Sequence, residues 1–288
     1  MELTYKKLTA LNFEDALELF NKGFEGYKIP MNLTMEQFMN RFGSEGLSAE
    51  LSIVAFDGEV PVGFVLQGIK EEADMKIAWN GGTGIVPEYR GKQVGFHLIK
   101  ESEKILLENN VDVATLEALS ENSPAIRLYE KCGYQIVDNL VFLSVKGSLM
   151  KNLPSLGEFQ LERFPAFQAI GSDLFPAIVP WQTSPSIVPK VGGEVVLLKK
   201  EGAVRAACLI RKRAVYGAKT EGITLFQLSG NGNPEEIELL LAHALEFDQD
   251  LGRSTYNFST GDGAVLNLLL SYGFEKTPIS QVFMTKKL

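Results

Sequence analysis

An internal repeat constrains the fold of this chain more than any other feature of its sequence. One apolar pattern ending in glycine returns 140 residues later, so that Ala125, Leu128, Tyr129, Cys132, Gly133 and Tyr134 correspond to Val265, Leu268, Leu269, Tyr272, Gly273 and Phe274. The hairpin pattern around Asp57-Gly58 returns 144 residues later around Glu201-Gly202, again between apolar runs. Two matches at nearly the same offset predict a duplicated domain. Two unrelated α/β domains that share common hairpin and cap patterns are the alternative.

The length and the charge of the chain fit this organisation. At roughly 150 residues per domain, 288 residues predict about two domains. The net charge of -8 arises in residues 1–150, which hold 14 basic and 22 acidic residues against 14 and 14 in the rest. This balance argues against nucleic acid as a partner, because phosphate binding requires a basic face. An acidic first half favours a basic small molecule instead.

The sequence contains neither an export signal nor a membrane segment. The N-terminus alternates charged and apolar residues, and no window approaches the ~18 apolar residues of a membrane span. Two cysteines cannot form a disulfide framework, which favours a reducing compartment. We therefore expect a cytoplasmic protein with no membrane partner, and a homo-oligomer stays open.

The first half alternates helical and strand patterns. Apolar spacing predicts helices over 13–20 and 34–42, the second capped by Thr34, and two strands, 51–56 and 60–66, joined at Asp57-Gly58. A strand over 78–86, a helix over 91–109 and a strand over 111–119 follow. A short helix then has Ser123 as its cap, Pro124 at its first position and Gly133 as its stop. Strands over 134–137 and 141–145 end a domain of residues 1–146, and a linker over 147–157 precedes a second domain over 158–288.

Residues 84–96 carry the pattern that most clearly indicates chemistry. A strand ends, a basic turn with glycine follows, and an amphipathic helix begins. Free amides at the start of a helix form an anion site, and Arg90 and Lys92 add positive charge to it. The segment therefore has the properties of a pyrophosphate cradle.

This segment resembles motif A of the GCN5-related N-acetyltransferases (GNAT), with the pattern Gln/Arg-x-x-Gly-x-Gly/Ala, and residues 116–134 resemble motif B of that family. The resemblance implies an α/β (α+β) fold with two tandem acetyltransferase-type domains, each a mixed, strongly twisted sheet flanked by helices. It implies acetyl-CoA as the cofactor, bound by Gly84, Ile85, Val86, Arg90, Gly91, Lys92, Gln93, Val94, Gly95, Phe96, Asn122 and Tyr129. Gln93 departs from the family pattern, which has glycine there, but it keeps the backbone amide that binding uses.

The same resemblance suggests the catalytic groups. Tyr129 corresponds to the tyrosine that protonates the leaving thiolate in many members of the family; packing as a core aromatic is its alternative. Glu117 is a candidate general base on the strand beside the opening of the sheet, and a structural carboxylate is the alternative for it. The resemblance also implies that a strand amide near Ile85 holds the oxyanion. No metal site is expected, because His97 and His243 have no partners at ligand spacing.

The acceptor site is expected in the loop over 24–31 and beside the glycine-rich strand. Glu25, Tyr27, Trp79 and Asn80 are its candidate residues, and core packing is the alternative for Trp79 and Asn80. Glu25 and Tyr27 fit a cationic primary amine on a small molecule or peptide. In the second half Leu269 replaces the tyrosine, and Glu235 and Glu236 stand where the first half has Arg90 and Lys92. We therefore expect an active first domain and a degenerate second one. A non-catalytic acyl-CoA sensor and a partner-binding protein remain the alternatives.

Overall fold

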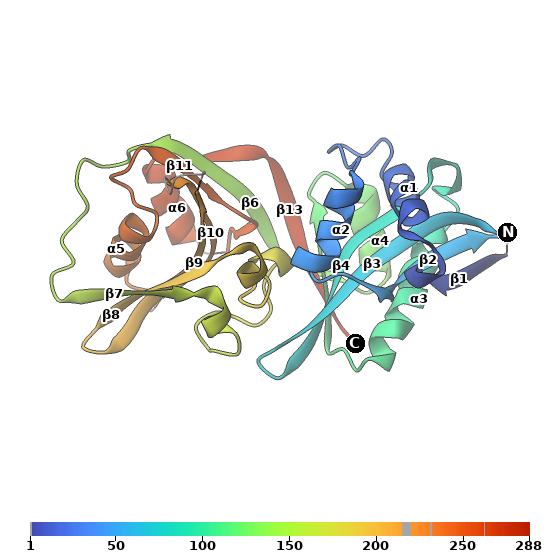
Figure 1. The fold of residues 1–288 in the computed structure, drawn as a ribbon, viewed down its shortest axis with the longest axis horizontal. Coiled ribbons are helices and arrows are strands. Elements are labelled where there is room, and N and C mark those ends of the chain that lie inside the picture. The colour runs from blue at the N-terminus through green and yellow to red at the C-terminus, as the bar shows by residue number, and fades with distance from the viewer. Residues whose placement is uncertain (1, 215–219, 231, 262) are drawn as a thin grey trace. The chain divides into compact units, whose positions relative to one another are not determined.

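The computed structural model describes residues 2–214, 220–230, 232–261 and 263–288. Their contacts divide the chain into two units (Figure 1). Unit 1 contains the chain through Ala118, Asn122–Val137 and Met284–Leu288, and unit 2 contains Leu119–Glu121 and Asp138–Phe283. The last residues of the chain therefore complete unit 1, where the Leu288 amide donates to the Asp112 carbonyl and Lys286 forms an ion pair with Glu103.

Unit 1 is built on a mixed sheet. Its strand order is β1 (Leu3–Lys7), β2 (Ser48–Asp57), β3 (Val60–Glu72), β4 (Met75–Ile85) and β5 (Val113–Leu119). The first three pairings are antiparallel and β4 runs parallel to β5. The β4–β5 pairing ends at Asn80 and Leu116, although both strands continue beyond these residues. The two strands are thus not paired with each other toward their carboxyl ends, although β4 stays paired with β3 as far as Ile85.

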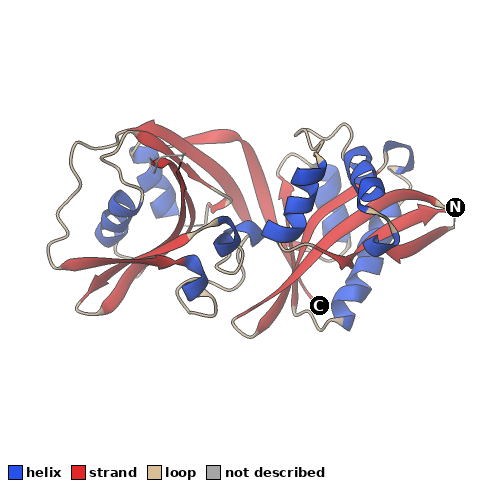
Figure 2. Cartoon of the chain, in the orientation of Figure 1, coloured by secondary structure: helices blue, strands red, loops and turns tan. Residues whose placement is uncertain are grey.

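Helices cover both faces of this sheet (Figure 2). They are α1 (Phe13–Gly23), α2 (Met35–Ser44), α3 (Val94–Glu108) and α4 (Ser123–Lys131), with 3-10 turns at Leu8–Ala10 and Pro87–Tyr89. Phe64 of β3 stacks on Phe20 of α1, whereas its neighbour Gly63 lies against Leu98 of α3. Because successive strand residues face opposite sides, α1 and α3 lie on opposite faces of the sheet.

Unit 2 repeats this order. The strands after α4 are β6 (Gln135–Gly147), β7 (Phe159–Pro165), β8 (Glu194–Lys200), β9 (Ala203–Ala214), β10 (Thr220–Gly230), β11 (Leu251–Thr255), β12 (Phe258–Ser259) and β13 (Glu275–Lys287); β6 begins in unit 1 and β13 ends there. The helices are α5 (Pro234–Ala244) and α6 (Gly263–Ser271). The series β7, β8, β9, β10, α5, β11, α6, β13 matches β1, β2, β3, β4, α3, β5, α4, β6, and β10 runs parallel to β11 as β4 does to β5. The predicted duplication is confirmed.

One difference separates the two copies. Between β7 and β8 the chain forms three 3-10 helices, Ala166–Ala169, Trp181–Thr183 and Val188–Val191, where unit 1 has α1 and α2. These segments contribute to a core on one sheet face that includes Val188, Leu197 and Phe226, while α5 packs on the other face around Cys208 and Leu240. Both faces of the second sheet are therefore covered as well.

Most predicted elements of the first half are present with bounds shifted by a few residues, and three further differences concern a cap, a merged strand and the start of a helix. Thr34 forms a capping box with Gln37, and the hairpin after Asp57 is confirmed. The short helix is capped by Asn122 rather than Ser123, because the Asn122 side chain accepts from the Ala125 amide. The two strands expected after Gly133 form the single strand β6. The helix expected from residue 91 begins at Val94, because Gly91 and Gln93 have left-handed φ angles of 73° and 62°. No helix among the described residues is long and apolar enough to cross a membrane.

Candidate active site

A cavity of about 570 Å³ lies in unit 1, where β4, α3 and α4 meet the end of α1. Its lining includes most residues predicted from the sequence to bind a cofactor: Ile85, Arg90, Gly91, Gln93, Val94, Gly95, Phe96, Asn122 and Tyr129. Glu25 and Tyr27, predicted for the acceptor, line the same cavity. Gly84, Val86, Lys92, Trp79, Asn80 and Glu117 are not among the lining residues.

The start of α3 presents backbone donors to this cavity. The first helical hydrogen bond runs from the His97 amide to the Gln93 carbonyl, so the amides of Val94, Gly95 and Phe96 precede it. Within the described residues, Gln93 makes no side-chain cap, and the first turn holds no acidic residue. The positive end of the helix dipole is therefore directed at the cavity without internal compensation.

Gln93 stands where the family pattern has glycine, and it adopts the conformation that glycine favours. Its φ of 62° and ψ of 7° lie in the left-handed region. A residue with a Cβ pays roughly 1–2 kcal/mol to remain there. The turn therefore has the backbone conformation that a glycine would adopt, and keeping Gln93 in that conformation costs conformational energy.

Three glycines shape the site for different reasons. A Cβ on Gly84 would overlap the Phe64 ring, and Gly84 also lies against Gly23 at the end of α1. A Cβ on Gly95 would lie 2.9 Å from Leu128 Cδ2, so Gly95 permits the close approach of α3 to α4. A Cβ on Gly91 would meet nothing within 4 Å among the described atoms. Glycine is favoured at this position because of its left-handed φ of 73°.

Arg90 connects the loop after α1 to the end of β4. Its Nε donates to the Ile85 carbonyl at 2.9 Å, and its Nη2 donates to the carbonyls of Glu25 at 2.7 Å and Gly23 at 3.2 Å. The guanidinium therefore positions one wall of the cavity while its charge stays at the rim. Lys92 is exposed and lies over the Tyr89 ring, 5.2 Å from the ring centroid.

Tyr129 is a buried phenol on the wall of the cavity. Burial raises the pKa of Tyr129 to about 12, although a hydrogen bond with the Thr83 side chain opposes the rise. An ordinary tyrosine has a pKa of about 10. Because the shift is upward, the phenol keeps its proton throughout the neutral range and remains a donor.

Polar groups surround this phenol in a connected series. The Asn80 side chain donates to Thr83 Oγ1 at 2.8 Å, and Thr83 in turn bonds Tyr129. On the other side of the cavity burial raises the pKa of Tyr27, and its hydrogen bond with Asn122 opposes that rise. Asn80 thus acts on the cavity through Thr83, although it does not line it.

Trp79 and Glu117 form a pair outside the cavity lining. Trp79 Nε1 donates to Glu117 Oε2 at 2.7 Å, which joins β4 to β5. Sequence reasoning considered the two residues separately, one for the acceptor and one as a base. It also missed Thr83, Gly23 and Leu128; nothing in the local pattern marks Thr83, because its role depends on the distant Tyr129.

The matching position in unit 2 has the opposite electrostatic character. Asn233 caps α5 through the Glu235 amide, and Glu235 and Glu236 occupy its first turn. Arg205 Nε lies 3.0 Å from Glu236 Oε1. Leu269, which takes the place of Tyr129, is fully buried. Among the described residues of the chain, no group of three His, Cys, Asp or Glu side chains could hold a metal ion.

Comparisons with known proteins agree with this geometry. Residues 13–134 match the Acetyltransferase (GNAT) family, while a search of curated proteins found no match. A GCN5-related N-acetyltransferase from Anabaena variabilis ATCC 29413 has a TM-score of 0.64 at 13% identity, over 99% of this chain and 72% of that one. The GCN5-related N-acetyltransferase from Sphaerobacter thermophilus has a TM-score of 0.61 at 13% identity, over 99% and 95%.

A tandem arrangement is also found among these structures. A tandem GNAT protein from the clavulanic acid biosynthesis pathway has a TM-score of 0.59 at 12% identity, over 99% of this chain and 98% of that chain. At such identities the likeness concerns the fold. It extends over both units, which the family match alone does not.

Proposed function

We propose that the chain is an acetyl-CoA-dependent N-acetyltransferase, because residues 13–134 match the acetyltransferase (GNAT) family and the fold of the whole chain is similar to that of a tandem GNAT protein. Unit 1 would transfer the acetyl group directly to a primary amine of a small molecule or peptide in a ternary complex. The observation that carries this proposal is the cavity in which free α3 amides and a protonated Tyr129 lie on neighbouring walls.

The residues of the cavity suit acetyl-CoA, which supplies the activated acetyl group when bound. The amides of Val94, Gly95 and Phe96 would hold the pyrophosphate, since a helix start without acidic residues favours anions. Gly84 and Ile85 of β4, on the side that no longer pairs with β5, and the following Val86 would pair with the amide-rich arm as an added strand. Asn122 lies at the opposite wall and can contact the same arm.

The groups of the chain then have separate tasks. Tyr129 Oη would hold the proton that the leaving thiolate takes up, and Thr83 keeps that hydroxyl oriented. A strand amide near Ile85 would stabilise the developing oxyanion. The hydrogen bond from Trp79 favours the structural alternative for Glu117, because one carboxylate oxygen is already engaged.

Glu25 and Tyr27 support a cationic acceptor. Both line the cavity, and Glu25 is exposed. A carboxylate at that place would attract an ammonium group before it enters as the free amine. In unit 2, by contrast, the acidic first turn of α5 would repel a pyrophosphate, so we propose that only unit 1 takes acetyl-CoA.

An amine panel tests the proposed reaction. The full chain is incubated with acetyl-CoA and primary amines of positive, neutral and negative charge, and free thiol and acetylated product are both measured. We expect release of CoA in amounts equal to the product, with cationic amines as the best acceptors. Binding of acetyl-CoA without product for any amine would favour the sensor; failure to bind it would favour a partner-binding protein.

The charge at the start of α3 gives a second test. Gln93→Glu adds one negative charge with almost no change of shape, and we expect acetyl-CoA affinity to fall about tenfold at low ionic strength and less in 1 M salt. Gln93→Gly removes the cost of the left-handed conformation. It should bind acetyl-CoA at least as tightly and raise the free energy of unfolding by up to about 1 kcal/mol. Equal affinities for the Glu and Gly variants would place the phosphates elsewhere.

Arg90 provides a test that separates geometry from charge. Arg90→Lys keeps the positive charge but cannot make the three bonds to the carbonyls of Ile85, Gly23 and Glu25. We expect Arg90→Lys to lose nearly as much acetyl-CoA affinity as Arg90→Gln, about five- to tenfold for bonds of this kind. Calorimetric titration measures both. Full affinity in Arg90→Lys would mean that only the charge matters.

A further inference from the structure

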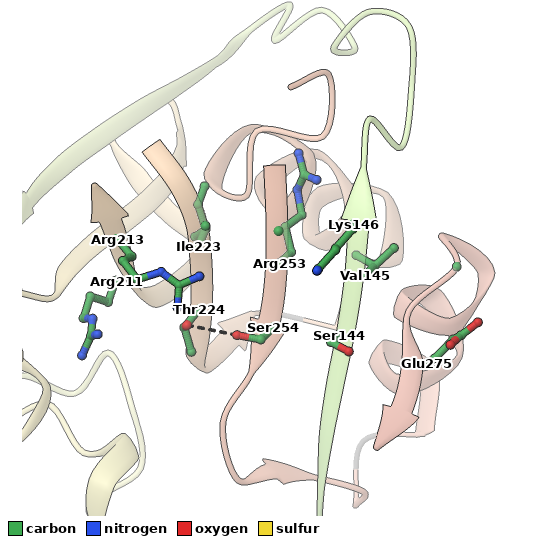
Figure 3. Close-up of a pocket in the computed structure, with 13 residues that line it drawn as sticks. Ser144, Val145, Lys146, Arg211, Arg213, Ile223, Thr224, Arg253, Ser254 and Glu275 are labelled. Carbon is green, nitrogen blue, oxygen red and sulfur yellow. Dashed lines mark hydrogen bonds between the residues drawn. The ribbon is translucent and has the colours of Figure 1, made fainter. Parts of the chain in front are cut away.

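A second cavity, of about 630 Å³, lies on one sheet face of unit 2, over β9, β10, β11 and β6 (Figure 3). Two rows of Cα partners cross this face. The first contains Arg211, Thr224, Ser254 and Ser144, and the second contains Arg213, Gly222, Gly252 and Lys146. Because residues two apart on a strand face the same way, both rows share one face. None of these residues belongs to the proposed acetyl-CoA site.

The floor of this cavity is bare backbone with two hydroxyls at its edge. Gly222 and Gly252 are adjacent partners and carry no side chains, so a ligand can approach the sheet closely there. Thr224 Oγ1 and Ser254 Oγ lie 3.0 Å apart on the same face and form a hydrogen bond (Figure 3). A hydroxyl pair can offer a donor to an incoming anion.

Two cations border this floor. In Figure 3, Arg213 and Lys146 point toward one another from either side of β10 and β11, whereas Arg211 and Glu275 point away. The Arg213 guanidinium extends over the floor: a Cβ on Gly222 would lie 3.3 Å from its Nη2. Arg213 and Lys146 form no ion pair with any carboxylate in the described part of the chain.

A third cation lies beneath the floor. Arg253 is buried and donates to the backbone carbonyls of Leu245 at 2.6 Å and Gly147 at 2.7 Å, and also to those of Glu246, Gln249 and Leu251. These are neutral acceptors, so they satisfy its donors without cancelling its charge. Burial lowers the pKa of Arg253, but an arginine keeps its proton at neutral pH. The carboxylates of Glu246, Asp248 and Asp250 act on Arg253 and oppose this lowering, so the charge that the proposal uses is that of Arg213 and Lys146 at the sides of the floor.

We propose that this cavity binds a small molecule bearing a phosphate group. The phosphate would lie over Gly222 and Gly252, between Arg213 and Lys146 of the same row, with the Thr224–Ser254 hydroxyl pair of the next row at its edge. Phosphate has enough acceptor oxygens for a guanidinium, an ammonium and a hydroxyl at once, whereas a carboxylate has two. The volume falls within the range of small-molecule sites. The second half has 14 basic and 14 acidic residues, which does not favour nucleic acid.

Titration of the full chain with inorganic pyrophosphate tests this site. The first cavity would also hold pyrophosphate, so each variant is prepared both alone and with Gly95→Val, which is expected to weaken binding there. Binding that remains in the Gly95→Val background then belongs to unit 2, whether or not the proposed enzyme function holds. We expect Lys146→Ala and Arg213→Ala each to weaken binding in unit 2 about tenfold, and the double variant to abolish it. Lys151→Ala with Lys190→Ala makes the same charge change at exposed positions outside the cavity and should bind like the parent.

A third variant tests the floor while leaving the cations intact. A Cβ on Gly252 would meet only the Glu221 carbonyl, at 3.6 Å, so Gly252→Ala should fold normally yet weaken pyrophosphate binding at least threefold. Circular dichroism checks the fold of every variant. Binding in the double cation variant equal to that of its control would overturn the proposal. A second result would also overturn it: a 20-base-pair duplex that binds more tightly than pyrophosphate and loses this binding in the double cation variant. The face would then be a nucleic-acid surface.

Discussion

Tyr129→Phe is expected to lower turnover by roughly 10²–10³-fold, the usual scale for loss of a positioned acid. The substitution removes one hydroxyl and leaves the ring, which packs edge-on against Tyr134, in place. Acetyl-CoA affinity should change little, because the amides of α3 are untouched. Turnover is measured as free CoA released with an amine that the parent acetylates, and affinity is measured by titration.

Two controls make this result specific to the proton. Thr83→Val removes the hydroxyl that bonds Tyr129 but leaves the phenol, so we expect a smaller loss of turnover. Leu269→Tyr in the background of Tyr129→Phe places a phenol in unit 2 and should restore nothing, since α5 begins with Glu235 and Glu236. Full turnover in Tyr129→Phe would mean that Tyr129 is not the acid and only packs as a core aromatic.

Gly95→Val is expected to weaken acetyl-CoA binding at least about 100-fold, which corresponds to roughly 2.7 kcal/mol. A Cβ at this position already lies 2.9 Å from Leu128 Cδ2 and 4.0 Å from Ile85 Cγ1, and all three residues line the cavity. The methyl groups of valine would therefore displace the Leu128 side chain between α3 and α4 and narrow the cavity that these residues line. Titration calorimetry with acetyl-CoA measures the loss, and thermal unfolding measures the stability.

Gly91→Ala is the matched control for this steric effect. Its Cβ would meet nothing within 4 Å among the described atoms, but alanine is strained at a φ of 73°. We expect it to lower the free energy of unfolding by roughly 1–2 kcal/mol while acetyl-CoA affinity changes much less than in Gly95→Val. If the two variants lost affinity equally, the backbone of the turn rather than the space beside Gly95 would control binding.

Local patterns in the sequence were sufficient to predict the elements and the duplication. Hairpins, caps and apolar spacing depend on neighbours along the chain, so the Asp57-Gly58 turn and the Thr34 cap are both found in the structure. The helix end at Gly133 is likewise set by one local conformation, a φ of 97°. Ser123 and Asn122 are both good caps by residue type, and only the geometry of the fold decides that Asn122 caps the short helix.

The parts of the site that sequence reasoning missed depend on contacts between distant residues. The sequence predicts that Arg90 binds phosphate. In the structure its Nη2 donates to the carbonyls of Glu25 and Gly23, which lie 65 and 67 positions earlier in the chain. Thr83 becomes relevant only because the fold places it beside Tyr129. The cavity of unit 2 has no sequence signature either, since its cations come from two separate strands. Such groupings follow from strand register, which local periodicity does not determine.

The stoichiometry of acetyl-CoA binding tests most directly whether the cavity of unit 1 is the cofactor site. We would titrate the full chain with Lys146→Ala and Arg213→Ala, which lacks the two cations of the unit 2 cavity and serves here as the parent, and the same chain with Gly95→Val, using acetyl-CoA and calorimetry under the same salt conditions. We expect one molecule bound per parent chain and loss of that binding in Gly95→Val, because unit 2 begins its matching helix with two acidic residues. Binding of two molecules per parent chain, or unchanged binding in Gly95→Val, would contradict the assignment.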